Sequence, residues 1–256
     1  MAAFQPSEMR SIPDAITTSA ANALQAMVLA LVPDIKSFYP PLMFSYATGT
    51  RKAEGTREAD AKGTGPGLVF AAQLALRFHK AGVPCFTGLH VPEGEDWKIY
   101  YPRLDSRFSK CTVFIVLLTA AFYQSKNCLQ EVATALRAKK VTKIIPVRME
   151  EGLPGVDDQW PMIEADDTEN VQRLTEVQRE LGKLNAFPAR GTLFSDPAYL
   201  GQLLEKVMSE LGLPAPAVEM GDAGGGGGGA AGAAHAADED ERARRAVAAT
   251  HQAGTL

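Results

Sequence analysis

The chain has 256 residues, 46% of them hydrophobic, which is enough for one large core and ordinary for a globular protein. Lysine and arginine number 26 against 30 aspartate and glutamate, a formal net charge of -4, so no overall positive field attracts nucleic acid or a membrane surface. Cys85, Cys111 and Cys128 lack paired zinc-ligand spacing and the histidines are scattered, so we predict no metal site and a reducing, cytoplasmic setting.

Residues 1–39 are predicted to form an N-terminal helical extension. Asp14 is a candidate cap for a helix that ends near Val32, where Pro33 stops it. The apolar stretch of this helix is interrupted by polar residues such as Asn22, and we therefore expect it not to span a bilayer.

Residues 40–212 alternate between short apolar runs and segments of helical periodicity. Strands are expected over 42–46, 83–86, 113–118, 144–147 and 192–194, and helices over 68–80, 101–108, 129–136, 174–184 and 197–211. Gln73, Arg77 and Lys80 should lie on the polar face of their helix. Gly212 should close the last helix, which Asp196 precedes.

Strands that alternate with crossover helices predict a flavodoxin-like α/β fold. We expect a mostly parallel, five-stranded sheet with helices on both faces. Ligands then collect at the carboxyl ends of the strands, so the loops after Tyr46, Phe86 and Leu118 should lie together.

Two segments lack helical or strand periodicity. Residues 48–66 form a polar, glycine-rich loop whose length requires either a function or disorder. Gly63, Gly65 and Gly67 at its end precede a helix start, where exposed amides can bind phosphate. Without the Lys-Ser/Thr of a P-loop they are interpreted mainly as a flexible lead-in, with phosphate contact as the alternative. Residues 213–256 contain a glycine run and should form a disordered tail, since they cannot bury enough apolar surface.

The order and spacing of several motifs resemble the TIR (Toll/interleukin-1 receptor) domain family. The resembling segments are the first-strand motif Met43-Phe44-Ser45-Tyr46, the helix-glycine-strand unit over 76–86, the third strand and its exit over 109–123, and Asn127-Cys128-Leu129-Gln130-Glu131, which is similar to the family's Trp-Cys-Leu-x-Glu signature. Asn127 stands where many members have tryptophan, and the loop 48–66 is longer than usual.

A subset of TIR domains cleaves the bond between nicotinamide and ribose in NAD+, and the signature glutamate is essential there. The resemblance therefore implies Glu131 as the catalytic residue, with NAD+ as substrate and no cofactor. Because Leu129, Val132 and Leu136 face the core, Glu131 projects away from that stripe and can face the cleft. It lies in the first turns of its helix, where the dipole favours an ionised carboxylate. Such a carboxylate would bind ribose hydroxyls and stabilise positive charge on the ribose.

Other residues are predicted to line the same site. Tyr46, Ala47 and Thr48 end the first strand, and Cys128 lies beside Glu131. Trp97 could stack on adenine or on a neighbouring subunit. The alternatives remain open that Tyr46 is a core aromatic, that Trp97 is a buried anchor and that Glu131 is a solvated helix residue.

The family's BB loop corresponds to residues 87–97. The resemblance implies head-to-tail assembly with other TIR domains through this loop, giving a homo-oligomer on activation with an interface formed by Pro92, Glu93, Gly94, Glu95 and Asp96. We predict a signalling protein that converts NAD+ to ADP-ribose or its cyclic form when self-associated. The alternative is a non-catalytic TIR adaptor, whereas a receiver-like switch lacks its acidic cluster at 44–48.

Overall fold

The computed structural model describes residues 16–32, 39–52, 55–61, 64–91, 110–138, 141–154 and 168–214. All belong to the first of two compact units, Met1–Pro216 and Ala217–Leu256. The predicted helix over 101–108, the interface residues 92–96, Trp97 and nearly all of the tail lie outside the described residues. None of the described helices has the length and apolar character needed to cross a membrane. The boundaries at 39/40 and 212/213 stay predictions.

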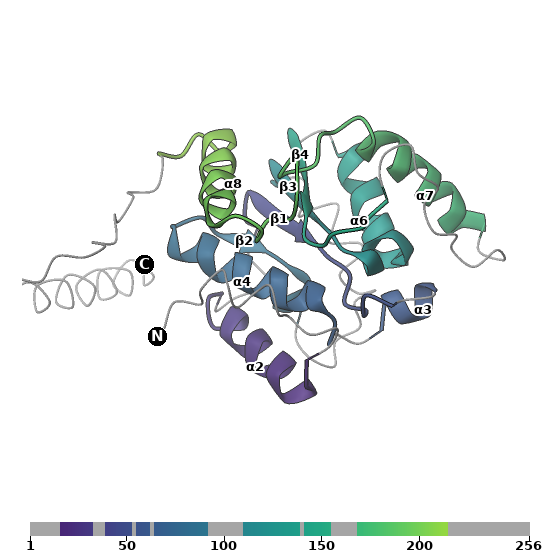
Figure 1. Cartoon of the computed structure of the whole chain (residues 1–256). Coiled ribbons are helices and arrows are strands. Elements are labelled where there is room, and N and C mark those ends of the chain that lie inside the picture. The colour runs from purple at the N-terminus through teal and green to yellow at the C-terminus, as the bar shows by residue number, and fades with distance from the viewer. Residues whose placement is uncertain are drawn as a thin grey trace, which may run out of the picture. The chain divides into compact units, whose positions relative to one another are not determined.

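A parallel sheet forms the centre of the described fold (Figure 1). Its strands are β1 (Leu42–Ser45), β2 (Cys85–Phe86), β3 (Val113–Leu118) and β4 (Lys143–Arg148). Their order is β2-β1-β3-β4, and all neighbours pair in parallel. This is the flavodoxin-like order, which confirms the predicted fold class. All six residues of β3 are buried, as expected for a central strand covered on both faces.

The fifth strand predicted over 192–194 is wrong, because these residues run through a turn. They contact the sheet through the Leu193 amide, which donates to the Arg148 carbonyl oxygen at 2.8 Å. The place beside β4 is taken by a single parallel bridge between Val147 and Phe187. Pro188 follows Phe187 and has no N–H to donate, so pairing does not continue.

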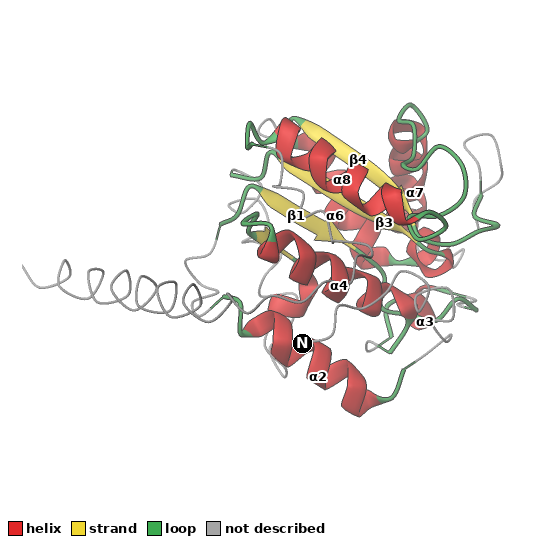
Figure 2. Ribbon diagram, turned by 60° about the vertical axis from the view of Figure 1, so that its left-hand side comes forward, coloured by secondary structure: helices red, strands yellow, loops and turns green. Residues whose placement is uncertain are grey.

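Helices cover both faces of this sheet (Figures 1 and 2). Their bounds are α2 (Thr18–Leu29), α3 (Thr56–Ala59), α4 (Pro66–Lys80), α6 (Lys126–Arg137), α7 (Thr168–Leu181) and α8 (Pro197–Glu210), with short 3-10 turns η1 (Gly88–His90) and η2 (Ala120–Gln124). The alternation of β3 divides the core: Val113, Ile115 and Leu117 pack with α2, α4 and α8, whereas Phe114 and Val116 pack with α6 and α7.

The described helices depart from the predictions at three places. α2 is capped by Thr17, whose side chain accepts from the Ala20 amide, and Asp14 lies outside the described residues. Gln73 was predicted on a polar face but is buried, because the first two turns of α4 are enclosed on all sides. The loop 48–66 contains the one-turn helix α3, which places Asp60.

Gly65 and Gly67 allow the start of α4 to lie against the chain that leaves β1. A Cβ atom on Gly67 would come within 2.1 Å of the Ala47 carbonyl oxygen, and one on Gly65 within 1.8 Å of the Gly49 oxygen. The interpretation of Gly65 and Gly67 as a flexible lead-in is therefore wrong, and Gly63 lies outside the described residues. Glycine is required there because two backbones approach closely.

Replacing Gly67 by alanine should lower the free energy of unfolding by about 1–3 kcal/mol, since the new methyl group must displace backbone. Gly201 in α8 is the matched control, because a Cβ atom there meets nothing within 4 Å. Gly201→Ala should stabilise the protein by up to about 1 kcal/mol. Urea unfolding of both variants checks this, and wild-type stability in Gly67→Ala would contradict the close approach.

Candidate functional site

Glu131 lies on α6 and faces the carboxyl end of β1. Ser125 caps this helix by accepting a hydrogen bond from the Cys128 amide at 3.0 Å, and Glu131 is the sixth helical residue. It is only 9% exposed. Ser45 and Tyr46 at the end of β1 are close enough to interact electrostatically with it. Glu131 is therefore not a solvated helix residue but a carboxyl enclosed at the sheet edge where ligands of this fold collect.

Burial determines the charge of Glu131. Removal from water raises the pKa of this carboxyl to about 8; the Ser45 hydroxyl opposes the shift and the nearby Asp60 carboxylate adds to it. The carboxyl is thus largely protonated at neutral pH. The expectation of a carboxylate kept ionised by the helix dipole is wrong, because the dipole acts within the first turn and Glu131 lies beyond it.

Ser45 is a fully buried polar residue within an otherwise apolar strand. Its hydroxyl favours the ionised forms of Glu131 and Cys128. Its oxygen nevertheless makes no hydrogen bond of normal geometry with the described residues. The sequence presented Ser45 only as part of a strand motif; a single polar residue at the carboxyl end of a buried strand was the available signal.

Tyr46 and Cys128 complete the surroundings of Glu131. Burial raises the pKa of the Tyr46 phenol and of the Cys128 thiol, and the charge of Glu131 raises both further. Both side chains are therefore neutral at physiological pH and belong to the apolar core. Ala47 is buried, and the Thr48 hydroxyl donates to the Ala61 carbonyl oxygen at 2.7 Å.

Asp60 is a site residue that the sequence interpretation missed. Its Oδ1 accepts a hydrogen bond from the Ser125 hydroxyl at 2.5 Å, and its Oδ2 accepts one from the Lys126 amide at 2.9 Å. Burial raises the pKa of Asp60, although the hydrogen bonds to the first turn of α6 oppose this. No local pattern could reveal the contact, because Asp60 and Ser125 are 65 positions apart.

A polar cleft of about 790 Å³ lies at the same edge of the sheet. One oxygen of the buried Glu150 accepts from Arg51 Nε at 2.7 Å and the other from the Ala120 amide at 2.8 Å. Glu150 thereby joins the segments that leave β1, β3 and β4. The sequence interpretation also missed Glu150, both of whose carboxylate oxygens accept hydrogen bonds from neighbouring segments.

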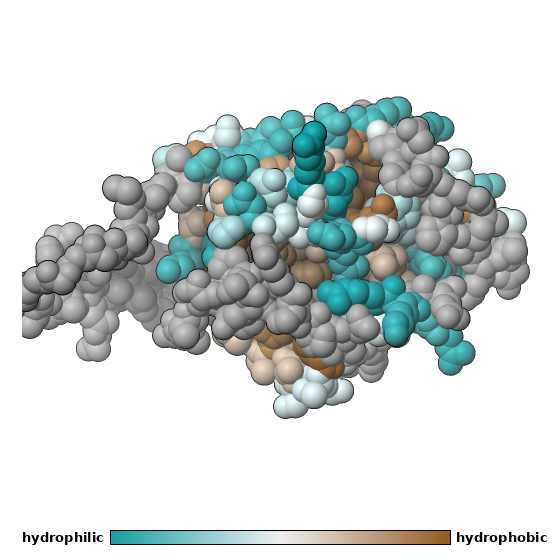
Figure 3. Space-filling view, viewed as in Figure 1, coloured by the Kyte–Doolittle hydropathy of each residue, from teal (hydrophilic) through white to brown (hydrophobic). Residues whose placement is uncertain are grey.

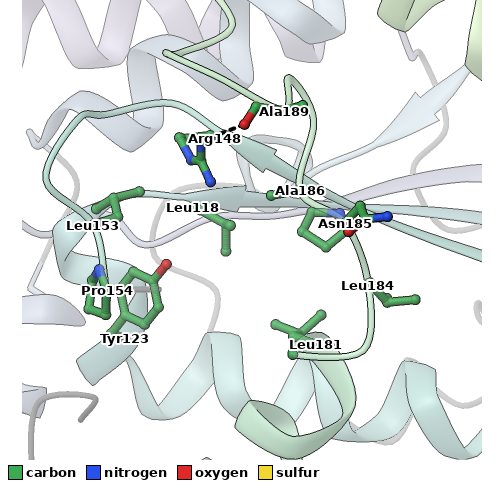
Figure 4. Close-up of a pocket in the computed structure, with 12 residues that line it drawn as sticks. Leu118, Tyr123, Arg148, Leu153, Pro154, Leu181, Leu184, Asn185, Ala186 and Ala189 are labelled. Atoms are coloured by element: carbon green, nitrogen blue, oxygen red, sulfur yellow. Dashed lines mark hydrogen bonds between the residues drawn. The ribbon is translucent and has the colours of Figure 1, made fainter. Parts of the chain in front are cut away.

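A more apolar cavity of about 480 Å³ lies beside β4 (Figure 4). Arg148 and Tyr123 border one side and Leu181 and Leu184 the other; Arg148 Nη1 donates a long hydrogen bond of 3.4 Å to the Ala189 carbonyl oxygen. Figure 3 shows hydrophobic residues on the surface near β4, within mostly hydrophilic surroundings. The residues that line this cavity include no carboxyl group.

In a comparison with known protein families, the TIR domain model matches residues 68–176. No curated protein matches the chain. Among solved structures, the chain is similar to the TIR domains of the activated Roq1 resistosome, which directly recognizes the pathogen effector XopQ. The two chains share 15% sequence identity with a TM-score of 0.45, and the alignment covers 66% of this chain and 99% of the Roq1 chain. The family match includes Glu131, whereas Ser45 and Asp60 lie before it. It confirms the predicted resemblance: residues 68–176 match the TIR domain family.

Proposed function

We propose that this TIR-domain protein hydrolyses NAD+ at Glu131 when copies of the chain associate. The observation that carries the proposal is that the Glu131 carboxyl is nearly buried at the carboxyl end of β1. Glu131 belongs to the segment of α6 whose sequence resembles the family's signature. A strongly perturbed carboxyl at the ligand-binding edge of an α/β sheet is a candidate for catalysis.

The chemistry follows from the charge of NAD+. The nicotinamide ring of NAD+ is cationic, so binding it beside Glu131 favours the ionised carboxylate. As the bond from the ring nitrogen to ribose C1′ breaks, its electron pair goes to nicotinamide, which leaves neutral. Glu131 then stabilises the positive charge on the ribose. Water adds to C1′ and releases a proton, giving ADP-ribose; attack by the adenine ring gives the cyclic product instead.

Assembly through the BB loop is part of the proposal, as is a cytoplasmic location. Residues 92–96 and Trp97 lie outside the described residues, so support for this interface comes from the family resemblance. Trp97→Ala and charge reversal at Glu93 and Glu95 should lower the light-scattering mass under conditions where the wild type associates. An unchanged mass would contradict this interface.

Nicotinamide release by the purified chain tests the proposed function. The rate per molecule should increase with protein concentration and when the chain is fused to an oligomerising domain, because assembly is expected to activate it. Release of no nicotinamide even by the fused oligomer would contradict an enzymatic role.

A non-catalytic TIR adaptor is the second candidate. The raised pKa of Glu131 favours this function, because a buried acid with a purely structural role would also be protonated. Asn127, which stands where many family members have tryptophan, favours it as well. An adaptor would associate with TIR domains without consuming NAD+, so the same assay separates the two functions.

A further inference from the structure

Asp60 connects two segments that are distant in sequence. Its carboxylate accepts hydrogen bonds from the Ser125 hydroxyl and the Lys126 amide, and the same Ser125 oxygen accepts from the Cys128 amide. The first turn of α6 is therefore held by its own cap and, in addition, by a carboxylate from the loop 48–66.

The backbone around Asp60 is itself attached to the chain leaving β1. The Gly49 amide donates to the Ala59 carbonyl oxygen at 2.9 Å, and the Thr48 hydroxyl donates to the Ala61 carbonyl oxygen at 2.7 Å. Both neighbours of Asp60 are thus fixed to the exit of β1. Asp60 links that exit to α6, the two elements that surround the Glu131 carboxyl.

We propose that Asp60 is a positioning residue for Glu131: it fixes the start of α6 against the exit of β1 and places a second negative charge beside the Glu131 carboxyl. This inference rests on the proposed function and gives the long loop 48–66 a role in it. A helix cap alone would need no residue from another segment, because Ser125 already caps α6.

The negative charge of Asp60 raises the pKa of Glu131, and the Lys126 cation at the start of α6 favours the charged form of Asp60. Tyr46 and Cys128 also interact electrostatically with Glu131, and burial keeps both of them neutral. The hydrogen bonds that Asp60 accepts favour its charged form. Removing this charge should therefore lower the pKa of Glu131.

Two variants separate position from charge. Asp60→Ala removes the link, and it should reduce kcat for nicotinamide release about 10- to 100-fold with little change in KM, since small displacements of a reacting group have effects of this size. Asp60→Asn keeps an acceptor and loses the charge, so the pH at which kcat/KM rises should move to lower values. Glu58→Gln, on the exposed surface of α3, is the matched control and should behave as wild type.

A titration without substrate keeps the inference testable if the proposed function fails. Carbon-13 NMR of the full chain, with the Glu131 signal assigned by its absence in Glu131→Gln, should show Glu131 titrating at lower pH in Asp60→Asn than in wild type. An unshifted titration would overturn the electrostatic role, and wild-type kcat in Asp60→Ala would overturn the positioning role. If wild type releases no nicotinamide, the enzymatic proposal fails while the titration still decides whether Asp60 controls Glu131. Should Asp60→Ala not fold, Ser125→Ala tests the same link from α6.

Discussion

Replacing Glu131 by glutamine should abolish nicotinamide release while the protein remains folded. Glutamine has nearly the same shape as the protonated carboxyl, so the packing beside Ser45 and Cys128 is preserved. It cannot acquire the negative charge that stabilises the ribose cation. Loss of an electrostatic contact of this kind reduces kcat about 100-fold or more. Chromatographic detection of nicotinamide at high protein concentration measures the effect.

Glu176 provides the control for this substitution. It lies on α7, packed against α6, and its carboxylate pairs with Arg137 at the surface at 2.5 Å. Surface ion pairs contribute little, so Glu176→Gln should retain wild-type activity. Equal activity in Glu131→Gln and Glu176→Gln would show that Glu131 has no catalytic role.

The stability of the protein should decrease as pH rises toward 8, and Glu131 should cause much of that decrease. The pKa of its carboxyl is about 8 in the folded chain, against an ordinary value of 4.5. Between these values the folded chain holds a proton that the unfolded chain has lost, so a rise in pH favours unfolding. The stabilisation is complete below the ordinary pKa and is lost as pH rises through about 8. One such group changes the free energy of unfolding by up to about 1.4 kcal/mol per pH unit.

Glu131→Gln should remove this pH dependence, because glutamine does not titrate. Urea unfolding at pH 5 to 9 should show the variant gaining stability relative to wild type by a few kcal/mol across the interval. Groups that do not interact with Glu131 titrate alike in both proteins, so the difference reports Glu131 and the neighbours coupled to it. Parallel stability curves for the two proteins would contradict a buried, protonated carboxyl.

Elements whose character depends on local pattern were predictable from the sequence. The bounds of β3 were predicted correctly because an unbroken apolar run is what a strand buried on both faces requires. α8 was predicted from Asp196, which caps it, and from Gly212, which ends it at a positive φ. The failed fifth strand was a short apolar run around Leu193, and a run of that length does not distinguish a strand from a buried turn.

The candidate site was only partly predictable for a related reason. The position of Glu131 follows from helical spacing and a local motif. Its charge does not, because burial is produced by segments far away in the chain. Asp60 and Glu150 were missed since their contacts join loops that only the fold brings together.

The most direct test of catalysis by Glu131 is the pH dependence of nicotinamide release by the oligomerised chain, measured from pH 6 to 9 beside Glu131→Gln. The ionised carboxylate is the active form, so kcat/KM of the wild type should rise with pH and reach half of its plateau near pH 8. The variant should release almost none at any pH. Absence of release by the wild type, or equal release by the variant, would contradict catalysis by Glu131.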